Sequence, residues 1–222
     1  MEFDFKEYDK VLIGIGDDFN TKIPDECKNA WDEYDYINNN IDTNIVEAYN
    51  NLAKKLDGID YYIVSTCTDD LIYKSNIDAT KVVTPCGGFR FLQCIDDCSH
   101  QLLPFEEDMY DNRANITCPF CHKEVVFNKL PLDKYNEGGY MDAWQDYNKW
   151  LQSTINKKLL IIEAGVGLAY PTVIRFPFEK TAFYNQKSVM YRIHETLAFS
   201  TPELKERCIC VKTNPVELLK NI

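Results

Sequence analysis

The chain has 222 residues, of which 45% are hydrophobic, and its 35 acidic and 24 basic residues give a net charge of −11. This length is enough for one large α/β domain with a small insertion, or for two modest domains. The negative field repels nucleic-acid phosphates and anionic lipids, so neither a nucleic acid nor a membrane is expected as a partner. The first ten residues, MEFDFKEYDK, lack the long apolar run of a signal peptide or anchor, which predicts a cytoplasmic protein.

The first ninety residues alternate between short β-branched runs and a helical pattern. Residues 11–15 form an apolar run that ends in Gly-x-Gly, as a buried strand entering a tight loop does. Residues 45–57 place apolar side chains on one helical face, and the pattern stops at Gly58. Residues 61–65 and 81–84 are again strand-like, and a short helix is expected between them.

The same alternation returns in the second half of the chain. A helix is predicted over residues 141–156, followed by LLIIEAG, an apolar run typical of a strand buried on both faces of a parallel sheet. A helix after Pro171, strands over 189–193 and 208–211, and a closing helix, NPVELLKNI, complete the pattern. These elements predict an α/β fold with a doubly wound, Rossmann-like parallel sheet, whose ligands bind at the carboxyl ends of the strands.

Residues 90–130 interrupt this pattern, because they show no helical periodicity and contain four of the nine cysteines. An odd number of cysteines in a cytoplasmic chain favours metal ligation or free thiols over a disulfide framework. Two pairs, Cys-x3-Cys and Cys-x2-Cys, lie about twenty residues apart and predict a structural Zn²⁺ site with the ligands Cys94, Cys98, Cys118 and Cys121. Unrelated buried cysteines are the alternative, and His100 or His122 lies close enough to replace one ligand.

The sequence therefore predicts two domains. A nucleotide-binding domain would comprise residues 1–89 and 131–222, with a lid segment near 20–45, and a zinc-ribbon-like module would comprise residues 90–130. The metal would order a module too small to form its own core.

Glycines recur where two of the predicted strands end. Gly14 and Gly16 follow the first strand, and Gly165 and Gly167 follow the apolar strand of the second half. Glycines in such loops let the backbone approach a pyrophosphate closely near a helix N-terminus. The pairs of glycines therefore favour a nucleotide ligand.

Five sequence elements occur in the order found in sirtuins, the NAD-dependent protein deacylases, and the chain resembles that family. They are Gly14-Ile15-Gly16 with Ile23-Pro24-Asp25; Ser65-Thr66-Cys67-Thr68-Asp69-Asp70-Leu71 in the place of Thr-Gln-Asn-Ile-Asp-Gly-Leu; Cys86-Gly87-Gly88 in the place of His-Gly-Ser; Gly165-Val166-Gly167-Leu168 with Pro171; and Tyr191-Arg192-Ile193-His194. The GVG loop, the RFPFE segment and the last helix are similar to a bacterial branch often encoded beside macrodomains, whose members resemble protein ADP-ribosyltransferases more than deacetylases.

The resemblance implies that NAD lies between the nucleotide fold and the zinc module. In the family, a histidine takes a proton from a ribose hydroxyl, and an asparagine positions the ribose and water. Cys86 stands at the histidine position and Cys67 at the asparagine position, while Asp69 remains, so these three are the candidate catalytic residues. A thiol of ordinary pKa, about 8.5, is a poor base at neutral pH, and ordinary deacetylation is not expected. The implied cofactor contacts are Gly14, Gly16, Asn20, Gly165, Gly167 and His194.

Two departures from the family bear on NAD binding. Asp17-Asp18 replaces the serine after the glycine loop, and Glu26-Cys27 replaces Phe-Arg, so that a positive contact for phosphate is lost and carboxylates are gained. Two like charges at about 4 Å repel by about 1 kcal/mol in water and about 4 kcal/mol at an effective dielectric of 20. The sequence therefore predicts NAD binding that is at least tenfold weakened.

Each candidate also has a structural interpretation. Asp69 suits the N-cap of the following helix, and Cys67 and Cys86 suit inert buried thiols. His194 suits a surface position at the end of a strand. An aromatic group in the lid segment predicts packing, or the lining of an acyl or peptide groove: Trp31, Tyr34 and Tyr36.

Three functions are consistent with these patterns. The first is an NAD-dependent enzyme, an ADP-ribosyltransferase or divergent deacylase that acts on an acceptor protein. The second is a non-catalytic module that binds NAD, ADP-ribose or a protein partner. The third is an interaction protein without a nucleotide, which Asp17-Asp18 would favour.

Overall fold

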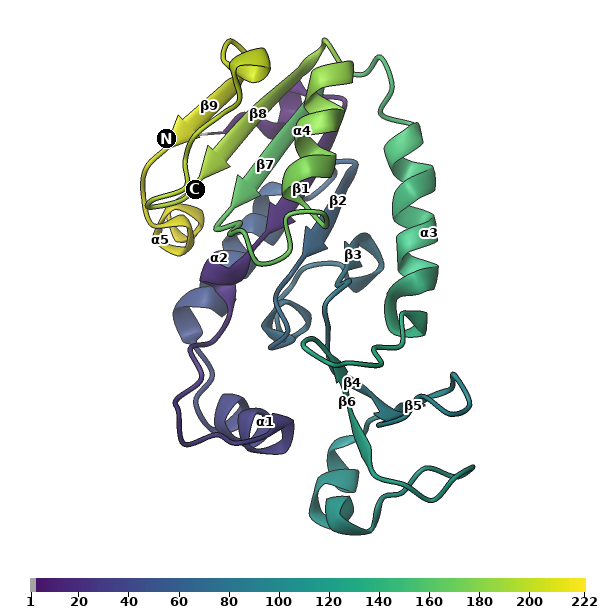
Figure 1. Cartoon of the computed structure of the whole chain (residues 1–222). Helices are drawn as coiled ribbons and strands as arrows, with labels where there is room; N and C mark the ends of the chain where they lie inside the picture. Colours follow the sequence, from purple (N-terminus) through teal and green to yellow (C-terminus); the bar gives the residue numbers. More distant parts are fainter. Residues whose placement is uncertain (1–2) are drawn as a thin grey trace.

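Six parallel strands form the main sheet of this computed structural model, which describes residues 3–222 (Figure 1). Their order across the sheet is β3-β2-β1-β7-β8-β9. The strand bounds are β1 Lys10–Ile15, β2 Tyr61–Ser65, β3 Val82–Val83, β7 Leu159–Ala164, β8 Ser188–Ile193 and β9 Cys208–Val211. The strand order reverses between β1 and β7, the point at which doubly wound sheets bind ligands. The predicted fold class is confirmed.

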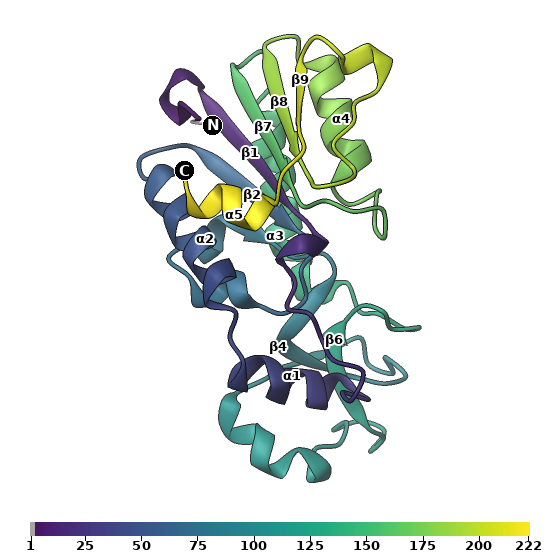
Figure 2. The ribbon, with the colours of Figure 1, turned by 90° about the vertical axis from the view of Figure 1, so that its left-hand side faces the viewer.

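Helices cover both faces of the sheet, as Figure 2 shows. On one face lie α2 (Thr43–Lys55) and α5 (Pro215–Lys220), and on the other lie α3 (Gly138–Gln152) and α4 (Arg175–Tyr184). The apolar sequence of β1 supplies both cores, because successive side chains of a strand point to opposite faces. Val11 and Ile13 join the core with Leu52 of α2, whereas Leu12 joins the core with Phe178 of α4.

Gly14 of β1 is required by close packing. A Cβ at this position would overlap the side chain of Ile174 and lie 2.9 Å from a ring carbon of Phe178. The absence of a side chain therefore lets the start of α4 pack directly on the strand. This contact fixes the position of α4 near the switch point.

A second sheet of three antiparallel strands lies below the main one in Figure 1. Its strands, in the order β5-β4-β6, are β5 Leu102–Pro104, β4 Gly87–Cys94 and β6 Val125–Lys129. Helix α1, Ala30–Asn39, packs on this sheet through aromatic rings, with Trp31 4.3 Å and Tyr34 5.5 Å from the ring centroid of Phe127. Packing is thus the role of these two lid aromatics.

Local differences from the expected elements have simple causes. The helix expected over 141–156 spans Gly138–Gln152, because two glycines are accepted in its first turn while Ser153 ends it. The segment without α-helical periodicity contains a 3₁₀ helix, Glu107–Asn115, which repeats every three residues and so lacks the pattern of an α-helix. Within residues 3–222, no helix is long and apolar enough to cross a membrane.

A buried cluster of four charged groups joins β7, β8 and α4. Arg192 and Glu163 are 2% and 1% exposed, and the guanidinium donates to both carboxylate oxygens, at 2.7 and 3.1 Å. Arg192 Nη1 also lies 2.9 Å from Glu179 Oε1. Arg175, buried beside them, donates to the carbonyl oxygen of Val166 at 3.4 Å. The charges balance, so their desolvation is offset by mutual attraction.

Replacing Arg192→Met should lower the free energy of unfolding by about 3–5 kcal/mol, because the buried carboxylate of Glu163 and the partly buried carboxylate of Glu179 would lose the guanidinium that pairs with them. Urea denaturation measures the change. Lys149→Met is the matched control, since Lys149 pairs with Asp146 on the surface of α3, and an exposed pair contributes about 0–1 kcal/mol. Equal losses in the two variants would contradict the expectation.

Candidate functional site

The loops after β1 and β7 touch at the switch point. The amide of Gly16 donates to the carbonyl oxygen of Ala164 at 2.9 Å, and a Cβ on Gly16 would overlap the carbonyl oxygen of Gly165. Gly165 has a φ of +65°, a left-handed conformation that favours glycine. The structure thus brings together three of the predicted cofactor-binding glycines, since Gly167 follows in the same loop.

Two carboxylates occupy the space beside these glycines. A Cβ on Gly167 would lie 2.7 Å from Asp17 Oδ2, and one on Gly165 would lie 2.6 Å from Asp18 Cβ. Thr66 Oγ1 donates to Asp17 Oδ1 at 3.2 Å. Burial raises the pKa of both carboxyl groups, although attraction to His194 opposes the rise. No lysine or arginine within residues 3–222 forms a salt bridge with Asp17.

His194 follows the end of β8 and lies beside Asp18, next to the contact between the glycine loops. Its side chain is 12% exposed, which corrects the interpretation as a surface histidine. Nδ1 accepts hydrogen bonds from the amides of Thr196 at 3.1 Å and Leu197 at 3.2 Å, and Nε2 lies 3.7 Å from Asp18 Oδ2. The sequence could not show this burial, because the covering residues come from the loop that follows and from the loop after β1.

A hydrogen-bonded group joins the loop after β1 to the loop after β2. Asn20 Oδ1 accepts the amide of Thr68 at 2.9 Å. Asp69 Oδ2 accepts the amide and hydroxyl of Thr21 at 2.8 and 3.0 Å, while Oδ1 accepts the amide of Leu71 at 3.1 Å. Asp69 therefore caps the turn that follows it and also anchors the lid segment. Burial raises its pKa, although these hydrogen bonds oppose the rise.

The two candidate thiols are buried. Cys67 is 4% exposed and its Sγ donates to the carbonyl oxygen of Gly16 at 3.2 Å, whereas Cys86 is 0% exposed. Burial raises the pKa of Cys67 well above the ordinary value and that of Cys86 to about 12. Both are neutral thiols at pH 7, so neither supplies a thiolate or a base. Their catalytic roles remain predictions.

Two pockets adjoin Asn20 and Thr21. One, of about 490 Å³, is lined by Thr68 and Asp69 and by apolar residues of α1 and of the segment after β6. The other, of about 430 Å³, is lined by Asp18 and by residues at the start of α2 and α5. Sequence reasoning missed Lys129, which lines the first pocket and pairs with Glu33 across 96 residues of sequence. No local pattern could have indicated so distant a pair.

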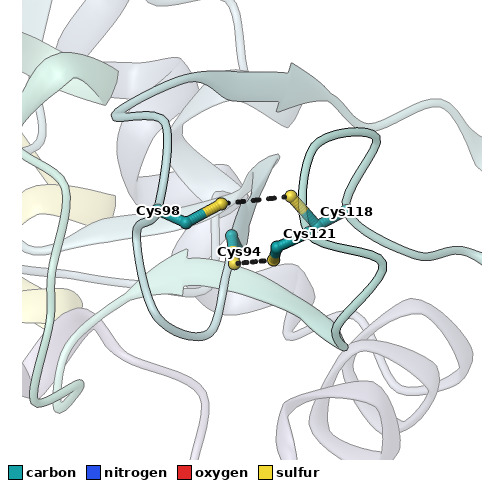
Figure 3. Close-up of side chains that lie close together, drawn as sticks. All are labelled: Cys94, Cys98, Cys118 and Cys121. Atoms are coloured by element: carbon teal, nitrogen blue, oxygen red, sulfur yellow. Dashed lines mark hydrogen bonds between the residues drawn. The ribbon is translucent and has the colours of Figure 1, made fainter.

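The four predicted zinc ligands converge in the small module (Figure 3). Cys94 Sγ and Cys98 Sγ lie 3.5 Å from Cys121 Sγ and Cys118 Sγ, respectively, and all four sulfurs are within 4.8 Å of one another. Four sulfurs about 2.3 Å from a tetrahedral Zn²⁺ would be about 3.8 Å apart, so the cluster fits this ion. With four protein ligands, such a metal is structural and has no position for a catalytic water.

The chain was compared with known sequences and structures. No protein-family model matches it. A protein ADP-ribosyltransferase of Staphylococcus aureus is 24% identical over 200 residues, covering 81% of this chain and 63% of the relative. A probable bifunctional ADP-ribose hydrolase/ADP-ribosyltransferase of Fusarium oxysporum f. sp. cubense is 23% identical over 139 residues, covering 55% of this chain and 23% of the relative. The chain thus spans less than two thirds of either.

Solved sirtuin structures match almost the whole chain. The structure of Sir2Tm bound to a propionylated peptide has a TM-score of 0.61 and 15% identity, covering 98% of this chain and 93% of that one. A mutant Sir2 homologue in complex with ADP-ribose has a TM-score of 0.60 and 14% identity, covering 98% and 91%. This chain therefore has the fold of sirtuins, and the similarity to sirtuins inferred from the sequence is confirmed.

Removing a zinc ligand should release the metal and loosen the small module, because Zn²⁺ binding orders modules with little core of their own. We expect about one zinc per chain in the purified protein, measured by elemental mass spectrometry, and a loss of most of it in Cys118→Ser. Cys210→Ser is the matched control, since Cys210 is an exposed thiol outside the cluster. Equal zinc content in both variants would argue against the site.

Proposed function

We propose that this chain binds NAD or ADP-ribose at the switch point of its main sheet, and that it transfers ADP-ribose to an acceptor protein. The observation that carries the proposal is the contact between the glycine loops after β1 and β7, beside two pockets that share Asn20 and Thr21. Ligands of doubly wound sheets bind at this place. Relatives named as ADP-ribosyltransferases and a sirtuin neighbour bound to ADP-ribose support the same ligand class.

The chemistry of the cleft favours ADP-ribosyl transfer over deacylation. The thiol of Cys86, with its pKa raised to about 12, cannot take the proton that the family's histidine takes. Transfer of ADP-ribose breaks the bond between nicotinamide and ribose C1′ and forms a bond from C1′ to a nucleophilic side-chain atom of the acceptor protein. Nicotinamide leaves with the bonding electron pair, the acceptor's proton passes to solvent, and positive charge develops on the ribose between the two events. Carboxylates beside the ribose would stabilise that charge, and we assign this role to Asp17 and Asp69, which contact Thr66 and Thr21 in the loops around the cleft.

A non-catalytic binding module is the second candidate. It is favoured by the burial of both thiols and by the full engagement of Asp69, whose two carboxylate oxygens accept three hydrogen bonds from Thr21 and Leu71. Such a site would hold the nucleotide without reacting with it. The two candidates differ in turnover, not in binding.

Titration calorimetry of the zinc-loaded protein with NAD and with ADP-ribose tests binding, and nicotinamide release tests turnover. We expect heat of binding with both ligands and slow release of nicotinamide from NAD. Binding without release would select the non-catalytic module. The absence of binding at millimolar concentrations of both ligands would overturn the proposed function and favour an interaction protein.

Neutralising the carboxylates beside the glycines should strengthen diphosphate binding. Asp17→Asn and Asp18→Asn each remove a negative charge that would repel the diphosphate from the glycine loops. We therefore expect affinity for ADP-ribose to rise about tenfold at low salt. The pKa of each carboxyl group is raised by burial. Protonation therefore begins at a higher pH than in an exposed aspartate, and wild-type affinity should rise as the pH is lowered toward these raised pKa values.

The matched control is Asp146→Asn, because Asp146 is an exposed carboxylate on α3. This change reduces the net negative charge by the same amount without altering the cleft. An equal gain in affinity for all three variants would assign the effect to overall charge. Weaker binding in Asp17→Asn alone would instead make its carboxylate a ligand contact, for example to a ribose hydroxyl.

A further inference from the structure

Asp70 combines two unfavourable features at the boundary between the two sheets. It lies in the loop after β2 and has a φ of +57°, a left-handed conformation that glycine adopts at lower cost than aspartate. Its carboxylate is directed at the first residues of β4, and the side chain is 11% exposed. The residue thus connects the main sheet to the zinc module.

One oxygen of this carboxylate accepts a short hydrogen bond, and the other accepts none from the part of the chain that the structure describes. The amide of Phe89 donates to Asp70 Oδ2 at 2.5 Å. Oδ1 is buried and accepts no hydrogen bond from residues 3–222, and the nearest cation, Arg90 Nε, lies 3.9 Å away. Arg90 is engaged elsewhere, because it stacks on Tyr73 at 4.1 Å and donates to Thr84 at 3.1 Å.

Aspartate is not the residue that would make position 70 most stable. The left-handed conformation suits glycine better, and a buried carboxylate oxygen without a hydrogen bond is costly. Burial raises the pKa of Asp70 to about 6, although Arg90 and the Phe89 amide oppose the rise, and Asp69 and Lys129 are the other charged neighbours. Strain of this kind persists where the surrounding structure and function require it.

The facing residue shows that Asp70 and β4 are matched to each other. A Cβ on Gly88 would overlap Asp70 Oδ1. The sirtuin motifs quoted above have glycine at the position of Asp70 and serine at the position of Gly88. In this chain the side chain of the pair belongs to Asp70, and the glycine at position 88 leaves the space that its carboxylate occupies.

We propose that Asp70 is the positioning residue of the cleft, whose carboxylate fixes the start of β4, and with it the preceding turn at residues 85–86, against the loop of residues 66–69. This turn contains Cys86, whose carbonyl oxygen accepts the amide of Leu130, a residue that lines the first pocket, at 2.9 Å. Asp70 touches no ligand in this assignment. It sets the distance between the two walls that a nucleotide would contact, and so the affinity readout rests on the proposed function.

Asp70→Gly tests the assignment, because it relieves the left-handed strain while it removes the carboxylate. We expect a melting temperature no lower than that of the wild type, an affinity for ADP-ribose at least tenfold weaker, and a tenfold faster alkylation of Cys86 by a maleimide. Peptide mass spectrometry distinguishes Cys86 from the other thiols. The alkylation rate needs no nucleotide, so it remains decisive if ADP-ribose does not bind.

Two further variants separate positioning from general stability. Asn156→Gly is the matched control, since Asn156 has a φ of +62° and lies after α3, far along the chain from the cleft loops. It should relieve strain without changing affinity or Cys86 alkylation. Asp70→Asn keeps an acceptor for the Phe89 amide and should restore the wild-type alkylation rate.

Three results would overturn the assignment. The first is an alkylation rate of Cys86 in Asp70→Gly within twofold of the wild type. The second is a large fall in melting temperature with faster alkylation of Cys67 as well, which would make Asp70 an ordinary stabilising residue. The third is an Asp70→Asn variant as reactive as Asp70→Gly. Failure of ADP-ribose to bind the wild type would overturn only the proposed function.

Discussion

The close approach of the loops after β1 and β7 is the constraint on which the candidate site depends. Gly16 approaches the backbone of Gly165 closely because it has no side chain, and Gly165 holds a left-handed conformation. This contact brings Asp17, Asp18 and His194 to one point, although they come from the ends of different strands. The parallel sheet supplies the geometry, since strands of one direction end at one edge.

The zinc module forms the second wall through a different kind of interaction. Its small sheet has few buried aliphatic residues, and it is held by the four convergent thiols at one end and by an aromatic cluster with α1 at the other. The lid segment is therefore packed on the module and is also anchored to the main domain by Asp69 and Thr21. A nucleotide in the cleft would contact both parts.

The negative charge of two aspartates distinguishes this cleft from an ordinary phosphate-binding site, whose glycine loop carries no carboxylates. The carboxylates of Asp17 and Asp18 occupy the space that the glycines leave, and burial raises the pKa of both. Under the proposed function, the same carboxylates would weaken diphosphate binding and would stabilise positive charge on a ribose.

The sequence by itself determined the alternation of strands and helices and the zinc ligands, because apolar periodicity and cysteine spacing are local signals. It also placed Gly16, Gly165 and Gly167 after the strands that they follow, whereas Gly14 lies within β1. Only the tertiary structure decided that the side chain of His194 is largely covered, that Lys129 pairs with Glu33, and that Asp70 faces Gly88. These contacts join residues from separate loops, and their burial and hydrogen bonding arise only when the parallel strands bring those loops to one edge.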